Sequence, residues 1–181
     1  AFTTAESGLH AGFLAKFATA QGVTQNGQQQ HQHQGAHPAG GHLAGHGSAQ
    51  DDSHLGVVDV TATWQPVELE PYHALIQAGI VDTIMTAHVF NGTLDPTYPA
   101  TLSKSILTGI LRGQLGYDGV IISDDMNMRA ITGQYGFDEA IVLAVNAGVD
   151  ILAYGNNLVY EPAVAQRALD ALRKAVTAGE I

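Results

Sequence analysis

The chain has 181 residues, of which 45% are hydrophobic, so it is long enough for one domain with its own core. Its mean hydropathy of +0.05 is typical of a globular chain, and no apolar run approaches the roughly 20 residues that span a bilayer. The net charge of −10, with only seven Lys and Arg, argues against a nucleic-acid partner and suits a neutral substrate. The lack of cysteine excludes disulfides and thiolate chemistry.

The first 50 residues differ in composition from the rest. Residues 1–18 are rich in alanine, with apolar side chains at mostly helical spacing, and predict one amphipathic helix. Residues 19–50 consist largely of Gln, His and Gly, which bury too little apolar surface to offset the entropy of ordering; we predict a long loop there. We therefore divide the chain into a helix-plus-loop segment (1–50) and a βα domain (51–181). No secretory signal is visible at the start, which favours a cytoplasmic location.

From residue 56 onward, short apolar runs alternate with helical patterns. The runs are rich in Val, Ile, Leu and Met, as in parallel strands that are buried on both faces, so the pattern predicts parallel βα units. The expected strands are residues 82–90, 119–126 and 149–155, and the expected helices are residues 67–79, 101–116, 137–148 and 161–179. Several of these helices are followed by glycine, the usual C-terminal stop.

Each expected strand runs directly into polar residues. His88 ends the first, Ser123-Asp124-Asp125 ends the second, and Asn156-Asn157 follows the third. This arrangement is typical of α/β enzymes whose site lies at the carboxyl ends of the strands. A single strand-end aspartate could equally cap the next helix, but two in a row make it more probable that one faces a ligand. The tetrapeptide DDSH (51–54), taken alone, is more often a surface turn than a catalytic loop.

Together the motifs point to a known family. The segments GHG-x3-DDSH, TAHV, PATLS, LGYDGVIISDDMNM and AGVDILAYGNN follow one another between residues 42 and 179. In order and spacing they resemble the N-acetylhexosaminidase branch of glycoside hydrolase family 3. The resemblance implies a (β/α)8 TIM barrel, of which these segments correspond to the second half. The other branch of the family, the β-glucosidases, typically carries an SDW-like strand end and a glutamate as acid/base.

The resemblance also implies roles for individual residues. Asp124 corresponds to the nucleophile of retaining hydrolysis, and Asp52 with His54 corresponds to the acid/base dyad. A retaining glycosidase needs its two catalytic groups about 5 Å apart, so we expect Asp124 and His54 to converge on one sugar-sized hollow. We assign four further residues to sugar binding, with a buried role as the alternative for the last two: His42, His46, His88 and Met126. No cofactor is expected.

The chain departs from the family pattern in two respects. Gly41 stands where the family has a lysine that contacts the sugar, and the Gln/His-rich tract replaces the apolar strand that should precede it. A TIM barrel also takes roughly 250 residues, so at most four βα units are present. A half barrel leaves apolar residues and sheet edges exposed. We therefore expect self-association into a homodimer or a higher homo-oligomer.

Two other functions are compatible with the sequence. The chain could be a catalytically incomplete half-barrel fragment, which keeps the strand-end carboxylates without turnover. Alternatively, the histidines of the Gln/His-rich tract could bind a metal, since histidine is a common ligand of zinc, copper and nickel. The histidines concerned are His31, His33, His37, His42 and His46. Their spacing is loose and lacks a fixed partner set, so the glycosidase reading is favoured.

Overall fold

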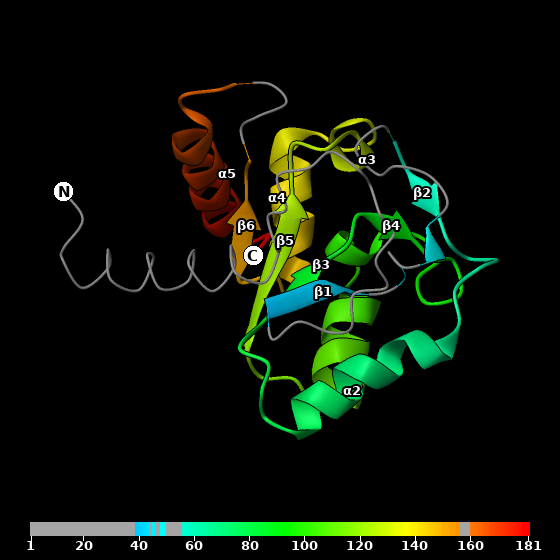
Figure 1. Cartoon of the computed structure of the whole chain (residues 1–181). Coiled ribbons are helices and arrows are strands. Elements are labelled where there is room, and N and C mark those ends of the chain that lie inside the picture. The colour runs from blue at the N-terminus through cyan, green and yellow to red at the C-terminus, as the bar shows by residue number, and fades with distance from the viewer. Residues whose placement is uncertain (1–38, 44, 46–47, 50–55, 156–159) are drawn as a thin grey trace, which may run out of the picture.

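A four-stranded parallel sheet forms the centre of the molecule, as a computed structural model shows. The structure describes residues 39–43, 45, 48–49, 56–155 and 160–181. The strands are β1 (Ala39–Leu43), β3 (Thr83–Thr86), β5 (Val120–Asp125) and β6 (Ile151–Ala153), which lie side by side in the order β1-β3-β5-β6 (Figure 1). All three strand pairs are parallel. The prediction of parallel βα units is therefore confirmed for this part of the chain.

Strand β1 corrects the prediction of a loop for residues 19–50. Ala39–Leu43 has the sequence AGGHL and pairs with β3, with Leu43 opposite Thr86. Glycine and alanine are poor strand formers, so composition gave no sign of a strand here. Pairing uses backbone groups alone, however, and the Leu43 side chain is fully buried in the core. β1 lies ahead of the division that we predicted at residue 50, and that division stays a prediction.

The apolar run predicted as one strand over residues 82–90 is two strands. β3 ends at Thr86, and after Ala87 and His88 the chain enters β4 (Val89–Phe90). β4 leaves the main sheet and pairs in parallel with β2 (Val58–Asp59). A small apolar cluster that includes Val58, Trp64 and Val89 holds this second sheet. An apolar run indicates that its residues are buried, but it does not indicate whether they lie in one hydrophobic cluster or in two neighbouring ones.

The helices follow the strands in the expected order, with boundaries that differ by a few residues. They are η2 (Pro66–Leu69), α2 (Glu70–Gln77), η3 (Ala100–Leu102), η4 (Ser105–Gln114), α3 (Arg129–Thr132), α4 (Phe137–Ala147) and α5 (Val164–Ala178). The predicted helix over residues 101–116 begins as the short η3 and continues as η4, a helix of π type. Gly148 and Gly179 end α4 and α5 with φ angles of 114° and 73°, which glycine adopts without strain.

The main hydrophobic core lies between the sheet and the helices η4 and α4. Strand residues such as Leu43, Ile84 and Ile121 pack there against Leu107 and Leu111 of η4, all of them almost fully buried. Small residues of α4 let that helix approach the sheet closely: Ala140, Ala144 and Ala147. α5 packs on α4 through Ala168 and Ala171, which contact Ile141. The sheet is thus covered by helices in the manner of an α/β protein.

An ionic network fixes the amino ends of β5 and β6. Arg112 donates hydrogen bonds to the carbonyls of Tyr117 and Gly119 and forms an ion pair of 2.9 Å with Asp150. The same Asp150 oxygen accepts the Ile121 N–H at 2.7 Å. These contacts join the end of η4, the start of β5 and the start of β6. They set the register of the two strands at the edge of the sheet opposite to the polar strand ends.

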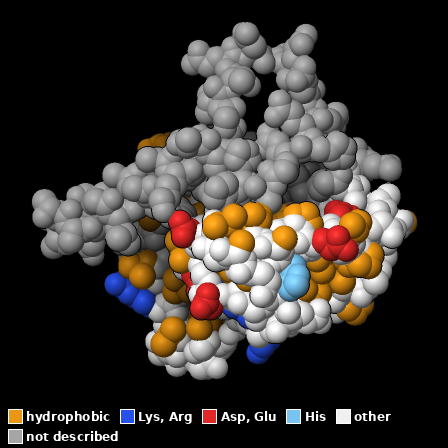
Figure 2. All heavy atoms as spheres, turned by 60° about the horizontal axis from the view of Figure 1, so that its bottom comes forward, with side chains coloured by type: hydrophobic (Ala, Val, Ile, Leu, Met, Phe, Trp, Pro, Cys, Tyr) orange, Lys and Arg blue, Asp and Glu red, His pale blue; other side chains and the backbone are white. Residues whose placement is uncertain are grey.

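The surface over α2 mixes apolar and acidic side chains. Figure 2 shows this face, which lies at the bottom of Figure 1, with apolar groups between carboxylates. Val67 and Ile80, just before and after α2, are among the exposed large apolar residues. Among the residues that the structure describes, no helix is long and apolar enough to cross a membrane.

Candidate functional site at the carboxyl end of β5

The carboxyl end of β5 contains a bulge at Ser123 and Asp124. Ile122 pairs with Ile151 and Asp125 pairs with Ala153, so two residues of β5 lie opposite one residue of β6. The Ser123 hydroxyl accepts the Ala153 N–H at 2.8 Å, and the Met126 N–H donates to the Ala153 carbonyl at 2.9 Å. A bulge redirects the side chain beside it and is common next to active sites. Here it sets the direction of Asp124.

Asp124 lies partly exposed at this strand end, with one carboxylate oxygen held by the backbone. Its Oδ1 accepts the N–H of Asp125 at 2.7 Å. The Asp125 side chain makes a different contact: its Oδ1 accepts the Asn127 N–H at 3.0 Å in the turn before α3. The two neighbouring carboxylates are therefore distinguished by their contacts. Asp125 stabilises the turn, and the Asp124 carboxylate stays partly exposed beside it.

His88 lies directly behind this strand end and is buried, with 1% of its surface exposed. Its Nε2 lies 2.9 Å from the carbonyl oxygen of Asp125, and its Nδ1 lies 2.8 Å from the hydroxyl of Thr101. A carbonyl only accepts, so Nε2 carries a proton and donates it. Thr101 is held in turn by the Thr86 hydroxyl at 2.7 Å and the Ala87 carbonyl at 2.9 Å. The predicted contact of His88 with a sugar would require one of these ring hydrogen bonds to be given up.

Asp95 organises the loop that carries Thr101 into place. It is 6% exposed, and its carboxylate accepts the Thr97 N–H at 2.8 Å, the Tyr98 N–H at 3.1 Å and the Ser103 hydroxyl. Burial opposes ionisation, but these hydrogen bonds outweigh it and hold the pKa of Asp95 below its ordinary value of 3.8. The Ser103 oxygen also accepts the Ile106 N–H in the first turn of η4. The loop is thereby tied to the helix that follows it.

Other residues predicted for the site fall into two groups. Met126 is 3% exposed and packs in the main core, which corresponds to the buried alternative. His42 lies in β1, where its backbone is the register partner of Met85. Asp52, His54 and His46 lie outside the residues that the structure describes, so their predicted convergence with Asp124 stays a prediction.

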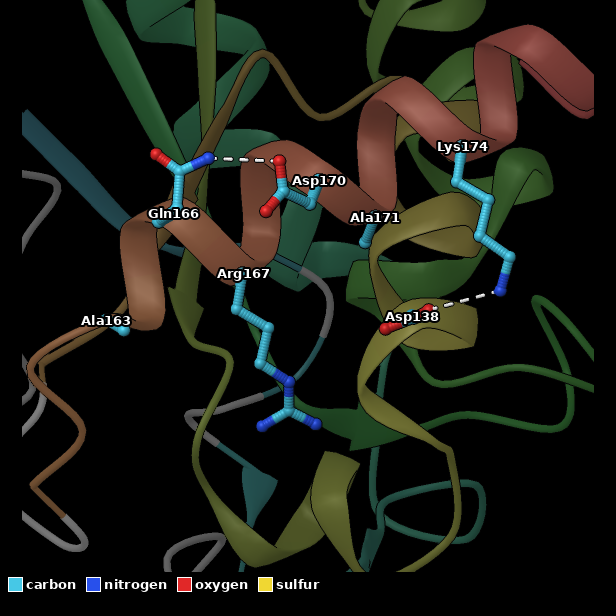
Figure 3. Close-up of a pocket in the computed structure, with 7 residues that line it drawn as sticks. All are labelled: Asp138, Ala163, Gln166, Arg167, Asp170, Ala171 and Lys174. Carbon is cyan, nitrogen blue, oxygen red and sulfur yellow. Dashed lines mark hydrogen bonds and ion pairs between the residues drawn. The ribbon is translucent and has the colours of Figure 1, made fainter.

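Two hollows of the described surface bear on the search for a site. One, of ≈ 370 Å³, lies on the outer helices α4 and α5 and is lined by paired polar groups (Figure 3). In it Lys174 lies 3.6 Å from Asp138, and Gln166 donates to Asp170 at 3.0 Å. The other, of ≈ 470 Å³, follows the turn after β5 and is lined by Gly56, Val57, Arg129, Thr132, Gly133 and Gln134. Neither hollow is lined by Asp124.

The predicted metal site finds no counterpart in the described part of the chain. No group of three or more His, Asp or Glu side chains there could hold a metal ion. The histidine tract on which that hypothesis depends lies outside the described side chains. The metal hypothesis therefore stays a prediction.

The sequence reasoning missed the hydroxyl groups of the site. Ser123, Thr86 and Thr101 are fully buried and make the hydrogen bonds that shape the β5 end and hold His88. Thr101 belongs to the PATLS motif, which contributed to the resemblance but suggested no role. Hydroxyl groups in otherwise apolar runs, as in TAHV and IISDD, were the available signal, because a buried hydroxyl needs a partner.

Comparison with known proteins extends over most of the chain. The beta-hexosaminidase of Tolumonas auensis is 41% identical over 126 residues, which are 68% of this chain and 37% of that protein. A beta-hexosaminidase of Xylella fastidiosa is 37% identical over 147 residues, which are 77% of this chain and 42% of that protein. A solved glycoside hydrolase family 3 beta-N-acetylglucosaminidase from Paenibacillus sp. str. FPU-7 has 40% identity and a TM-score of 0.69, covering 78% of this chain and 27% of that one.

The chain spans less than half the length of each of these relatives. Residues 14–181 match the family described as "Glycosyl hydrolase family 3 N terminal domain". This range includes every described strand and the aspartates at the end of β5. The parallel sheet, its polar carboxyl ends and this match agree with one another, and the chain belongs to glycosyl hydrolase family 3.

Proposed function

We propose that this chain carries the nucleophile and the acid/base groups of a retaining β-N-acetylhexosaminidase. The observation that carries the proposal is the partly exposed Asp124 carboxylate, held by the Asp125 N–H at the bulged carboxyl end of β5. Parallel α/β enzymes place their catalytic groups at this end of the strands. The relatives named beta-hexosaminidase support the substrate class.

The proposed reaction has two steps. Asp124 attacks the anomeric carbon while His54 protonates the departing oxygen, which gives a glycosyl ester of Asp124 and a free alcohol. His54 then takes a proton from a water molecule as its oxygen bonds to the anomeric carbon, which breaks the bond between that carbon and the Asp124 oxygen and releases the β-sugar and the Asp124 carboxylate. Asp52 orients the His54 ring and stabilises its charged form. Because imidazole titrates near neutral pH, one histidine can serve in both steps.

The test is hydrolysis of 4-nitrophenyl β-N-acetylglucosaminide by the full chain. We expect release of 4-nitrophenol, with the β anomer of the sugar formed first in the proton NMR spectrum. The matched β-glucoside, which lacks the acetamido group, should react much more slowly. If the α anomer forms first, the nucleophilic role of Asp124 is wrong. A folded chain with no turnover would favour the catalytically incomplete fragment.

We also propose that the half barrel is completed by self-association. Among the described strands, β1 and β6 are the outer members of the sheet and pair on one side only. Val120 and Ile151, at the starts of β5 and β6, are 37% and 38% exposed although both are apolar strand residues. Unpaired strand edges beside exposed apolar residues favour association.

Self-association predicts a definite mass in solution. Size-exclusion chromatography with light scattering should give at least twice the chain mass of 19.0 kDa. The double substitution of Val120 and Ile151 by Thr should shift the distribution towards the monomer, whereas Thr at the exposed Val176 of α5 should not. A monomer at all concentrations would contradict this proposal.

A further inference from the structure

The peptide group that follows Asp125 is fixed from several sides. The Asp125 carbonyl accepts hydrogen bonds from His88 Nε2 and from the Met128 N–H, both at 2.9 Å. On the other side of the same peptide plane, the Met126 N–H donates to the Ala153 carbonyl at 2.9 Å. A carbonyl oxygen has two lone pairs, so both acceptor positions of Asp125 are used. His88 supplies the only side chain among these three contacts.

This plane adjoins the peptide plane that holds the Asp124 carboxylate, because the two meet at the Asp125 Cα. The Asp125 N–H, which donates to Asp124 Oδ1 at 2.7 Å, belongs to the residue whose carbonyl His88 contacts. The Asp125 carbonyl and N–H are joined only through the Asp125 Cα, so fixing the carbonyl restricts the φ and ψ angles that set where the N–H points. A lost His88 contact therefore transmits to the direction of the carboxylate through one residue of backbone.

The opposite side of the His88 ring is fixed independently. Nδ1 contacts the Thr101 hydroxyl at 2.8 Å, and Thr101 is anchored to Thr86 and to the Ala87 carbonyl. Thr101 has one O–H proton, so either it donates to Nδ1 in place of the Ala87 carbonyl, or it donates to Ala87 and Nδ1 itself carries a proton. In both arrangements Nε2 keeps its proton for Asp125. The ring is thus a rigid strut between the end of β3 and the end of β5, which are neighbours in the sheet (Figure 1).

We infer that His88 is a positioning residue, which aims the Asp124 carboxylate by holding the Asp125 carbonyl. This inference rests on the proposed function, in which Asp124 is the nucleophile. It differs from the assignment of His88 to sugar binding. A sugar contact acts on substrate affinity, whereas the strut acts on the geometry of attack, and a misplacement of about 1 Å can cost on the order of 100-fold in rate.

Two substitutions separate the two sides of the ring. In His88→Gln the amide nitrogen lies the same number of bonds from Cα as His Nε2, so it can still donate to the Asp125 carbonyl. In His88→Asn the amide nitrogen corresponds to Nδ1, so it can reach Thr101 but not Asp125. Each variant keeps one of the contacts with Thr101 and Asp125 and loses the other, and both are neutral amides. They form a matched pair in which each is the control of the other.

Steady-state kinetics on 4-nitrophenyl β-N-acetylglucosaminide should give different kcat values for the two variants. We expect kcat to fall by at least about 30-fold in His88→Asn and by less than about 5-fold in His88→Gln, with KM nearly unchanged in both. Equal losses of kcat in the two variants would show that His88 is merely structural. A rise of KM in both, with kcat retained, would show a sugar contact instead. Either result overturns the inference.

Amide hydrogen exchange on the same full chains gives a readout that needs no turnover. The Asp125 and Met128 amides should exchange faster in His88→Asn, on the order of 10-fold, and near the wild-type rate in His88→Gln. If the wild-type chain has no activity, the proposed function fails while the exchange rates still decide whether the strut holds. If exchange is the same in both variants, the strut is wrong even when the wild-type chain is active.

Discussion

Replacing Asp124 with Asn should lower kcat for 4-nitrophenyl β-N-acetylglucosaminide on the order of 1000-fold or more, with little change in KM. The side chain keeps its shape, and its carbonyl oxygen can still accept the Asp125 N–H that now lies 2.7 Å from Oδ1. A neutral amide, however, cannot attack an anomeric carbon or stabilise an oxocarbenium-like transition state. Initial rates over a range of substrate concentrations measure the effect.

Asp125→Asn is the matched control for Asp124→Asn. It removes the same charge one residue away, but the Asp125 side chain bonds the Asn127 N–H in the turn before α3. We expect kcat to fall by less than about 10-fold, since the amide oxygen can keep that contact. Azide added to Asp124→Ala should restore turnover and give the α-glycosyl azide, because azide occupies the face that the carboxylate has left. Equal losses in Asp124→Asn and Asp125→Asn would remove Asp124 from its proposed role.

Replacing Asp95 with Asn should lower the free energy of unfolding by about 2–3 kcal/mol at pH 7, since hydrogen bonds to a buried carboxylate are among the stronger ones. Three donors converge on this group, from Thr97, Tyr98 and Ser103, and only one oxygen remains in the amide. Ser103 also accepts the Ile106 N–H, so the first turn of η4 loosens as well. Urea unfolding followed by circular dichroism measures the loss.

The effect of Asp95 should depend on pH in a defined direction. Its folded-state pKa lies below the ordinary value of 3.8, so the ionised form is stabilised by folding. The contribution is therefore fully present above the unfolded-state pKa of roughly 3.9 and is lost as the pH falls through the lower folded-state pKa. The difference between wild type and Asp95→Asn should be constant from about pH 5 to 8 and shrink below about pH 4.

The exposed Asp118 supplies the control for this titration. Asp118→Asn should change the free energy of unfolding by no more than about 0.5 kcal/mol at both pH 7 and pH 3, as is usual for an exposed surface position. A difference between wild type and Asp95→Asn that stays the same from pH 7 to pH 3 would contradict a stabilised carboxylate at residue 95.

Strands were predictable from the sequence where burial itself selects the residues. β5 lies within its expected range because a buried parallel strand needs a continuous apolar run. β6 also lies within its expected range, although its residues are exposed or half-buried. β1 was missed because AGGHL pairs through its backbone and contributes one large side chain to the core. The division of residues 82–90 between two sheets was missed because it depends on the distant β2, which a local pattern cannot report.

The same reasoning explains which parts of the site were visible. Asp124 was singled out because two aspartates in a row follow a buried strand, and the resemblance then implied its role, which stays a prediction. The contacts of Asp95 and Thr101 depend on folding of a loop whose partners are 8 to 15 residues apart, so spacing along the chain gave no indication of them. The acid/base dyad of Asp52 and His54 stays a prediction from resemblance.

Strand β5 is secured differently at its two ends. Its amino end depends on the ion pair of Arg112 with Asp150, whereas its carboxyl end depends on the Ser123 hydroxyl and the His88 imidazole. In enzymes of this architecture the amino-terminal side of the strands serves stability and the carboxyl-terminal side serves chemistry. One consequence for engineering is that substitutions that make the protein more heat-resistant can be sought around Arg112, away from the strand end where we propose that catalysis takes place.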